Sequence, residues 1–265
     1  GEEIADYSYN YKVGTMTVKN VSVYYYDSLR AAVDTDPETA MNMSETYKTD
    51  DILSISKAAT NANILSETYY KGEKGEEIAN FSYNFKFGTN TKKTTSIYFY
   101  ESGMLRADDA SVTTDSAMTR SDTYRTGDVL AAVRDLAIGN NLVSETFYKG
   151  GKGEEIADYS YNYKVGTMTV KNVSVYYYDS LRAAVDTDPE TAMNMSETYK
   201  TDDILSISKT ATNANILSET YYKGDKGDEI ANFSYNFKFG TDTKKTTSIY
   251  FYESGMLRAD AASVT

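Results

Sequence analysis

The chain of 265 residues contains no cysteine and no histidine. Without cysteine it can form no disulfide bond, no thiolate metal site and no thiol nucleophile. Without histidine it lacks the most common general base and the usual ligand of transition metals. These absences argue against an enzyme, and the sequence predicts no catalytic residue and no cofactor.

Long apolar runs and basic clusters are also missing. No segment approaches the roughly 18 consecutive apolar residues that a membrane-spanning helix needs, and the segment after Gly1 lacks the basic and apolar parts of a secretory signal. The formal net charge is −12, which opposes contact with nucleic-acid phosphates. We expect no membrane span in this fragment and no nucleic-acid partner, and any targeting signal is expected outside the given sequence.

Tyrosine, in contrast, is abundant. The chain has 26 Tyr, and aromatic residues make up 13% of it beside 25% charged residues. This composition supplies enough apolar and amphipathic surface to bury a core, unlike that of a disordered acidic tail. The sequence therefore predicts a folded protein.

A long internal repeat organises the whole chain. Residues 1–113 match residues 153–265 at an offset of 152, which indicates a recent duplication and a repeat array. The five positions that differ are Ala58 and Thr210, Glu73 and Asp225, Glu76 and Asp228, Asn90 and Asp242, and Asp109 and Ala261.

A weaker repeat lies inside the long one. The segment GEEIADYSYNYKVGT beginning at Gly1 is similar to GEEIANFSYNFKFGT beginning at Gly75. Because no Pro/Gly/Ser-rich linker separates these units, we expect them to stack directly. The predicted units are 1–74 (unit A), 75–152 (unit B), 153–226 (a copy of unit A) and 227–265 (a truncated copy of unit B).

Strict alternation of residue types over residues 5–13 predicts a strand, and residues 16–27 predict a second one after a turn at Gly14 and Thr15. The two should form a hairpin. The aromatic positions are expected to be buried and the polar positions between them exposed. The aromatic set is Tyr7, Tyr11, Phe81 and Phe85, and the polar set is Ser8, Asn10, Ser82 and Asn84.

Similar strand-turn-strand segments recur along the chain, which predicts an all-β protein. Its tandem hairpins should form either a β-solenoid or a single spiralling sheet. Residues 51–57 and 128–137 are both predicted as strands, because equivalent segments should share a fold. At most a short helix is expected near Pro37, capped by Asp36, and near Pro189.

One group of oxygen-bearing side chains has the spacing of a calcium loop. Thr39, however, stands where the sharp turn of such a loop needs glycine, and Pro37 stiffens the segment. A capped helix is therefore preferred, and no metal site is predicted. The weak calcium candidates are Asp34, Asp36, Glu38 and Glu45.

Two further groups were weighed against simpler interpretations. Glu76 and Glu77 could be paired catalytic carboxylates of a glycoside hydrolase, but neighbours on a strand point to opposite faces and a site copied in every unit would be unusual for an enzyme. The acidic run over residues 71–77 could bind cations, but mixed Lys and Glu around Gly are typical of a solvated turn, which is the preferred interpretation. A second group could form an aromatic platform for sugars, and cross-strand stabilisation of the sheet is the preferred explanation. Its members are Tyr24, Tyr25, Tyr26, Tyr69 and Tyr70.

Three turns carry a resemblance to a known family. The segments YFYESGMLR from Tyr98, YYYDSLR from Tyr24 and YRTGDVL from Tyr124 resemble the tyrosine-aspartate (YD) repeats of bacterial Rhs-type proteins. The turn after Tyr24 lacks the glycine of that pattern, and Met104 stands where the family has arginine. The resemblance implies a large secreted or surface protein whose hairpin strips spiral into a wall or shell, and it carries over no catalytic residue.

These observations together favour an architectural protein. The sequence predicts a structural repeat region of a long extracellular or cell-surface protein that forms a stalk, fibre or shell wall. Its expected partners are neighbouring repeats of the same chain, with other copies in a filament as a further possibility. The alternative is a set of adhesin repeats that bind glycans or a partner surface multivalently.

Overall fold

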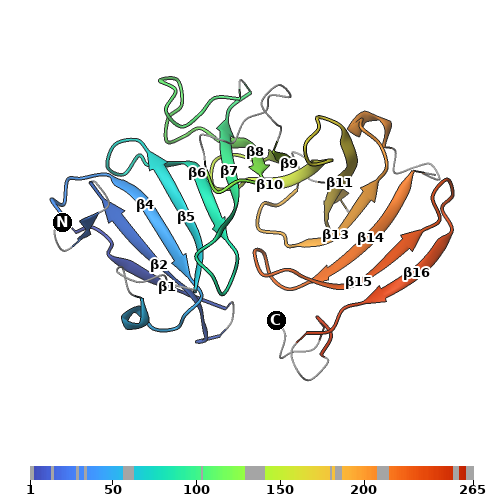
Figure 1. The fold of residues 1–265 in the computed structure, drawn as a ribbon, viewed down its shortest axis with the longest axis horizontal. Helices are drawn as coiled ribbons and strands as arrows, with labels where there is room; N and C mark the ends of the chain where they lie inside the picture. The colour runs from blue at the N-terminus through green and yellow to red at the C-terminus, as the bar shows by residue number, and fades with distance from the viewer. Residues whose placement is uncertain are drawn as a thin grey trace. The chain divides into compact units, whose positions relative to one another are not determined.

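The structure is a computed structural model with two compact units, Gly1–Leu142 and Val143–Thr265. The regular secondary structure of the described residues in each unit is almost entirely β-strand (Figure 1). The described residues are 3–12, 15–27, 30–32, 35–55, 63–102, 104–128, 141–179, 181–182, 187–207, 215–252 and 257–260.

In the first unit each long strand pairs with the next long strand along the chain. Short β3 (Arg30–Ala31) pairs only with β2. The strand order is β1 (Tyr7–Tyr11), β2 (Val18–Tyr26), β4 (Met41–Tyr47), β5 (Ile64–Lys71), β6 (Ile78–Phe85), β7 (Lys92–Tyr100) and β8 (Met118–Tyr124).

The second unit repeats this arrangement. Short β12 (Leu181–Arg182) pairs only with β11. The strand order is β9 (Leu142–Lys149), β10 (Ile156–Tyr163), β11 (Val170–Tyr178), β13 (Met193–Tyr199), β14 (Ile216–Lys223), β15 (Ile230–Phe237) and β16 (Lys244–Ile249).

The all-β prediction is confirmed, and the structure decides between the two architectures that the sequence left open. Consecutive strands within each unit pair antiparallel as an open sheet, and the described residues form no β-solenoid. Connections such as residues 72–77 between β5 and β6 permit only antiparallel pairing, because a parallel pairing needs a crossover of a dozen or more residues. The longer connection between β4 and β5 also joins an antiparallel pair.

The register of the sheet is the same in equivalent hairpins. Tyr9 lies opposite Val21 in β1–β2, and Tyr161 lies opposite Val173 in β10–β11. In both hairpins a β-bulge shifts the register directly after the next residue, Asn10 in the first hairpin and Asn162 in the second. Bulges bend a strand and increase its twist, so these shifts contribute to the twisting of the strands in Figure 1.

Two local predictions are wrong. The helix expected at Pro37 is a turn, in which the Asp36 side chain accepts the Glu38 N–H at 3.0 Å, and strand β4 begins at Met41. Its copy at Pro189 is also a turn. The chain leaves the turn at once because the Met-Asn-Met alternation that follows pairs with β2.

The strand expected over residues 51–57 is also absent from the described part of that segment, residues 51–55. Residues Ile52–Ser54 form a single 3-10 turn, with the Asp51 side chain accepting the Leu53 N–H at 2.8 Å. This capping bond gives the backbone a local partner that competes with a sheet ladder. The equivalent prediction over residues 128–137 lies, apart from Asp128, outside the described residues.

The predicted division into buried aromatic and exposed polar positions is wrong. Tyr7 and Tyr11 are 42% and 46% exposed, whereas Ser82 is 4% exposed. Phe81 and Phe85 are half-buried. Burial in this sheet depends on which strands flank a position as well as on the face it occupies, and β1 has a strand on only one side among the described residues.

A hydrophobic cluster of the first unit lies on one face of its sheet. Val21, Val23 and Tyr47 are buried there, and the 3-10 turn folds over them so that Ile52 and Ile55 pack against the cluster. The backbone N–H of Ile52 donates to the Tyr9 hydroxyl at 3.4 Å, which ties this loop to β1. The second unit has the same cluster around Val173, Val175, Tyr177 and Tyr199.

Helical structure is minor throughout. In the part of the chain that the structure describes, no helix is long and apolar enough to cross a membrane.

Candidate functional site

The two faces of each sheet carry different side chains. Alternation along β2 places Val21 and Val23 on one face and Ser22 and Tyr24 on the other. Glu45 lies opposite Val23, so we call the first face the carboxylate face. The second, which carries recurring Ser and Thr, is called the serine face.

On the carboxylate face Glu45 is held by two tyrosines. Its Oε2 accepts hydrogen bonds from the Tyr25 hydroxyl at 2.5 Å and from the Tyr47 hydroxyl at 2.7 Å. The arrangement recurs in the second unit, where Glu197 accepts from Tyr177 and, at 2.6 Å, from Tyr199. Hydrogen bonds to an ionised group are stronger than those between neutral groups, so each carboxylate fastens two strands together.

A second carboxylate stands directly across the sheet from the first. Glu67 of β5 is the register partner of Glu45 in β4. Its Oε2 lies 2.9 Å from the Lys92 ammonium, which also lies 3.7 Å from the centre of the Tyr83 ring. Opposed like charges destabilise a sheet, and Lys92 offsets that repulsion.

In the copy of this pair, the same opposing charges act on the pKa of Glu219. Burial raises the pKa of Glu219, the charge of Glu197 raises it further, and the Lys244 ammonium acts in the opposite direction. Lys244 lies 3.5 Å from the centre of the Tyr235 ring. The paired glutamates thus form a polar patch with cation and phenol partners within an otherwise apolar face.

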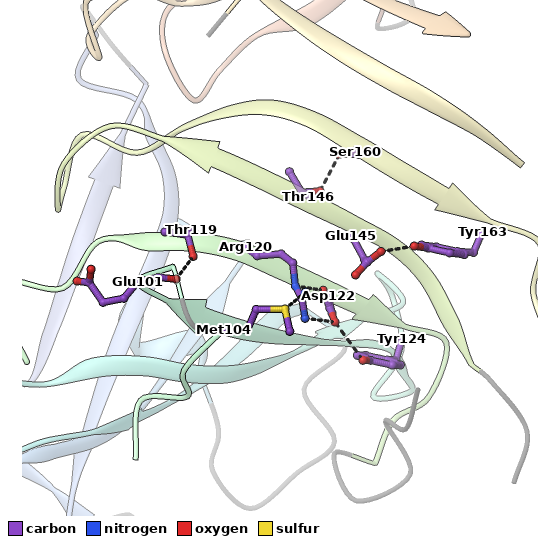
Figure 2. Close-up of polar contacts among 10 residues, drawn as sticks. All are labelled: Glu101, Met104, Thr119, Arg120, Asp122, Tyr124, Glu145, Thr146, Ser160 and Tyr163. Carbon is purple, nitrogen blue, oxygen red and sulfur yellow. Dashed lines mark hydrogen bonds and ion pairs between the residues drawn. The ribbon is translucent and has the colours of Figure 1, made fainter. Parts of the chain in front are cut away.

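Strand β8 replaces this arrangement with a buried ion pair, shown in Figure 2. Arg120 Nε lies 2.9 Å from Asp122 Oδ1, and Arg120 Nη2 donates to Asp122 Oδ2 at 3.1 Å. The Tyr124 hydroxyl also donates to Oδ2, at 3.2 Å. Arg120 further donates to the Met104 sulfur, and its guanidinium lies 4.4 Å from the centre of the Phe99 ring.

Units A and B use different combinations of residues around the carboxylate on this face. Met43 lies opposite Tyr25 in unit A, and Arg120 lies opposite Phe99 in unit B. Phe99 has no hydroxyl to donate, and the Arg120 guanidinium supplies the donors to Asp122 instead. Both units therefore satisfy a carboxylate at the same place in the sheet by different chemistry.

On the serine face, hydroxyl pairs join neighbouring strands at a fixed sequence separation. The hydroxyls of Ser8 and Tyr24 hydrogen bond at 2.9 Å across β1–β2, and the two residues are 16 positions apart in the sequence. The same pair forms in the equivalent hairpins, at Ser82 and Tyr98, Ser160 and Tyr176, and Ser234 and Tyr250.

The last tyrosine of each Tyr-aromatic-Tyr run bonds to backbone. The Tyr26 hydroxyl donates to the Ala5 carbonyl at 2.6 Å, and the Tyr178 hydroxyl donates to the Ala157 carbonyl at 3.0 Å. In the run Tyr24, Tyr25 and Tyr26, each hydroxyl therefore has a partner on a neighbouring strand or in the segment that leads into it. The geometry agrees with the preferred explanation that these rings stabilise the sheet.

The phenols on the carboxylate face are strongly perturbed. Burial, followed by the hydrogen bond to Glu45, raises the pKa of Tyr25 and of Tyr47 well above the ordinary value. The same causes raise the pKa of Tyr177 and Tyr199 beside Glu197. These shifts follow from holding a neutral phenol against a carboxylate in a water-poor site, and they suit a structural hydrogen bond.

The structure disperses the calcium candidates. Asp36 caps its own turn, Glu38 pairs with Lys74 at 3.3 Å, and Glu45 is held by tyrosines on the carboxylate face. Asp34 lies outside the described residues. Among the described residues, no three or more acidic side chains gather in an arrangement that could hold a metal ion.

The paired carboxylates of the acidic turn do not share a cleft. Glu76 is exposed in the turn between β5 and β6, where its N–H donates to the Glu73 carbonyl at 2.8 Å. The Glu77 side chain instead accepts the backbone N–H of Met41 at 3.0 Å, at the start of β4. Glu77 thus supports a strand end.

Sequence reasoning did not single out Glu67, Lys92, Arg120 or Asp122. A signal for the carboxylates was present in the recurring Ser-acid-Thr-aromatic motif, because an acid and an aromatic two residues apart share one face of a strand. No comparable signal identified Lys92 or Arg120. The motif begins at Ser44, Ser66, Ser121, Ser144, Ser196 and Ser218.

Comparison of the sequence with protein-family models gives no match, and a search of curated proteins finds no matching relative. The function therefore has to be inferred from the chain itself.

Proposed function

We propose that the chain is a structural repeat region of a long extracellular or cell-surface protein, and that its repeats form a stalk, fibre or shell wall. One comparison within the chain carries this proposal. Tyr163 of β10 is 8% exposed beside β9, which belongs to the preceding unit B, whereas the equivalent Tyr11 of β1 is 46% exposed. Among the described residues, β1 has a strand on one side only. A position of one unit is thus buried by the unit before it, as in a linear array.

The hydrogen bonds between strands support the same role. Side chains on both faces fasten each strand to the next, with Glu45 joining β2 to β4 and the Ser8–Tyr24 pair joining β1 to β2. The donors and acceptors of these hydrogen bonds therefore find their partners within the sheet. An array held this way gains stability with each added repeat, which suits a protein whose selected property is length.

The location is proposed from the resemblance to YD repeats, which implies a secreted or surface protein. Lateral association into filaments belongs to the same proposal. The rival function, multivalent binding of glycans or a partner surface by adhesin repeats, stays a prediction that a glycan array with the purified chain would test.

A length series tests the architectural proposal. Chains carrying one, two and three copies of the 152-residue repeat should melt at rising temperatures that level off, because each copy adds an interface while the two ends stay constant in number. Differential scanning calorimetry at equal mass concentration measures this. Identical melting curves for one and three copies would show independent domains and would contradict the proposal.

A further inference from the structure

Strand β1 leaves one edge without a strand neighbour among the described residues. Natural sheets protect such edges with lysine, proline or a covering segment, because unpaired N–H and C=O groups accept another strand. The β1 sequence, YSYNY, contains none of these protective residues. The edge is therefore open to strand addition.

The chain itself shows what covers this edge. Residues 4–11 and residues 156–163 have the same sequence, and β10 in the second copy is flanked by β9 as well as by β11. In the β9–β10 register, Phe147 lies opposite Tyr159 and Thr146 lies opposite Ser160. Each β1 side chain thus has a covered twin whose contacts are known.

The covering strand makes three kinds of side-chain contact with β10. Phe147 stacks on Tyr159 with ring centres 4.7 Å apart. The hydroxyls of Thr146 and Ser160 hydrogen bond at 2.8 Å, and Glu145 accepts the Tyr163 hydroxyl, as Figure 2 shows for these last two contacts. The twins of these β10 residues are Tyr7, Ser8 and Tyr11.

The exposed fractions of the equivalent residues show how much burial the covering strand β9 provides. Tyr163 is 8% exposed in β10, whereas Tyr11 is 46% exposed in β1. The same mode of covering recurs where Tyr69 of β5 stacks on Phe81 of β6 at 4.6 Å. It recurs again with Tyr221 and Phe233, also at 4.6 Å.

We propose that the outer edge of β1, which has no strand neighbour among the described residues, is a strand-accepting site for an antiparallel segment of the pattern Ser-Glu-Thr-aromatic-Tyr-Lys. Its aromatic residue stacks on Tyr7, its threonine pairs with Ser8, and its glutamate accepts the Tyr11 hydroxyl. Strand addition at an open edge takes its affinity from backbone hydrogen bonds and its specificity from such side-chain positions. The site deepens the proposed architectural function and rests on it, because it describes how one repeat receives the next.

A peptide with the sequence of Leu142–Lys149 tests the site on the intact chain. Titration of the fluorescently labelled peptide should give saturable binding, and hydrogen exchange should slow at residues 7–11. The identical residues 159–163 are an internal control, because β9 already covers them and their exchange should not change. A scrambled peptide of the same composition should neither bind nor protect.

Two single changes locate the contact. Replacing Phe147→Ala in the peptide, or the exposed Tyr7→Ser in the protein, should weaken binding by about ten-fold, since either removes the ring pair. Both changes together should weaken it little more than one alone. The Tyr7→Ser chain must keep the circular dichroism spectrum of the original.

Three results would overturn the proposal. These are absence of protection at residues 7–11 with the peptide in excess, equal binding of the scrambled peptide, and self-association of the chain that protects residues 7–11 without any peptide. The length series can succeed while the peptide fails, so loss of this site is distinguishable from loss of the architectural function.

Discussion

At the scale of single residues, the Arg120–Asp122 pair shows how a polar group is accommodated in this sheet. The Asp122 side chain is 1% exposed, and its two oxygens receive the guanidinium and the Tyr124 hydroxyl. A buried charge is tolerated only while its partner remains, because removing one member leaves the other desolvated and unpaired. The pair is thus a sensitive point of β8.

Replacing Asp122→Asn should destabilise the first unit by about 3 kcal/mol, because Arg120 keeps its charge in a buried site. Urea unfolding followed by circular dichroism measures the change. The matched control is Glu38→Gln, which removes the exposed pair with Lys74 and should alter stability by less than about 0.5 kcal/mol. Equal effects of the two changes would contradict the assigned role of Asp122.

A rescue experiment follows from the two unit types. The triple change Phe99→Tyr, Arg120→Met and Asp122→Glu rebuilds in unit B the set that unit A uses, and it should recover most of the stability that Asp122→Asn loses. A triple variant less stable than Asp122→Asn would show that the two sets are not interchangeable.

At the scale of elements, the turn between β5 and β6 illustrates how a short connection imposes antiparallel pairing. Gly72 and Gly75 both adopt positive φ, at 120° and 79°. A Cβ added at Gly72 would lie 2.2 Å from the Glu76 carbonyl oxygen, whereas one added at Gly75 would meet nothing within 4 Å. A side chain at Gly75 would therefore meet only an unfavourable backbone conformation, whereas one at Gly72 would also collide with the backbone.

Gly72→Ala should destabilise the β5–β6 hairpin by about 3 kcal/mol, and Gly75→Ala by about 1 kcal/mol. The first substitution adds a collision to an unfavourable backbone conformation, and the second adds only the conformational term. Hydrogen exchange of the β5 and β6 amides reports the local free energy of opening. If the two variants exchange alike, the close approach at Gly72 does not constrain the turn.

At the scale of the whole molecule, the tyrosine hydroxyls link stability to alkaline pH. The pKa of Tyr25, Tyr47, Tyr177 and Tyr199 is raised in the folded chain, chiefly by burial and then by the adjacent glutamate. In the unfolded chain a phenol ionises near pH 10. The stabilisation from these groups is therefore fully present below about pH 10 and is lost as the pH rises above it.

Raising the pH should thus leave a fraction of the tyrosines neutral past pH 10, and their ionisation should then accompany unfolding. Ultraviolet absorbance of tyrosinate and circular dichroism, recorded on the same samples, check this. In about 6 M urea, where the chain is unfolded, all tyrosines should titrate together near pH 10, which is about the pKa of a free phenol. Simultaneous titration in the folded chain without unfolding would contradict the buried hydrogen bonds.

The sequence by itself determined the fold class, the hairpins and the repeat, because alternation, tyrosine content and self-similarity are local properties of the chain. The first hairpin formed where alternation placed it, with Tyr9 opposite Val21. Local patterns failed where a capping side chain competed with the sheet, as at Asp51. The Ser-acid-Thr-aromatic motif carried the signal for the carboxylate face, although its partner Lys92 came from another strand and Arg120 stands just outside the motif on β8.

Burial was decided by tertiary structure alone. Tyr11 and Tyr163 stand in identical sequences, and only the second is buried, because β9 lies beside it and β1 has no second neighbour among the described residues. No local pattern distinguishes the two positions. In an open sheet the accessible surface of a residue depends on strands that are distant in sequence or belong to the next repeat, and this dependence links the fold to the proposed architectural function.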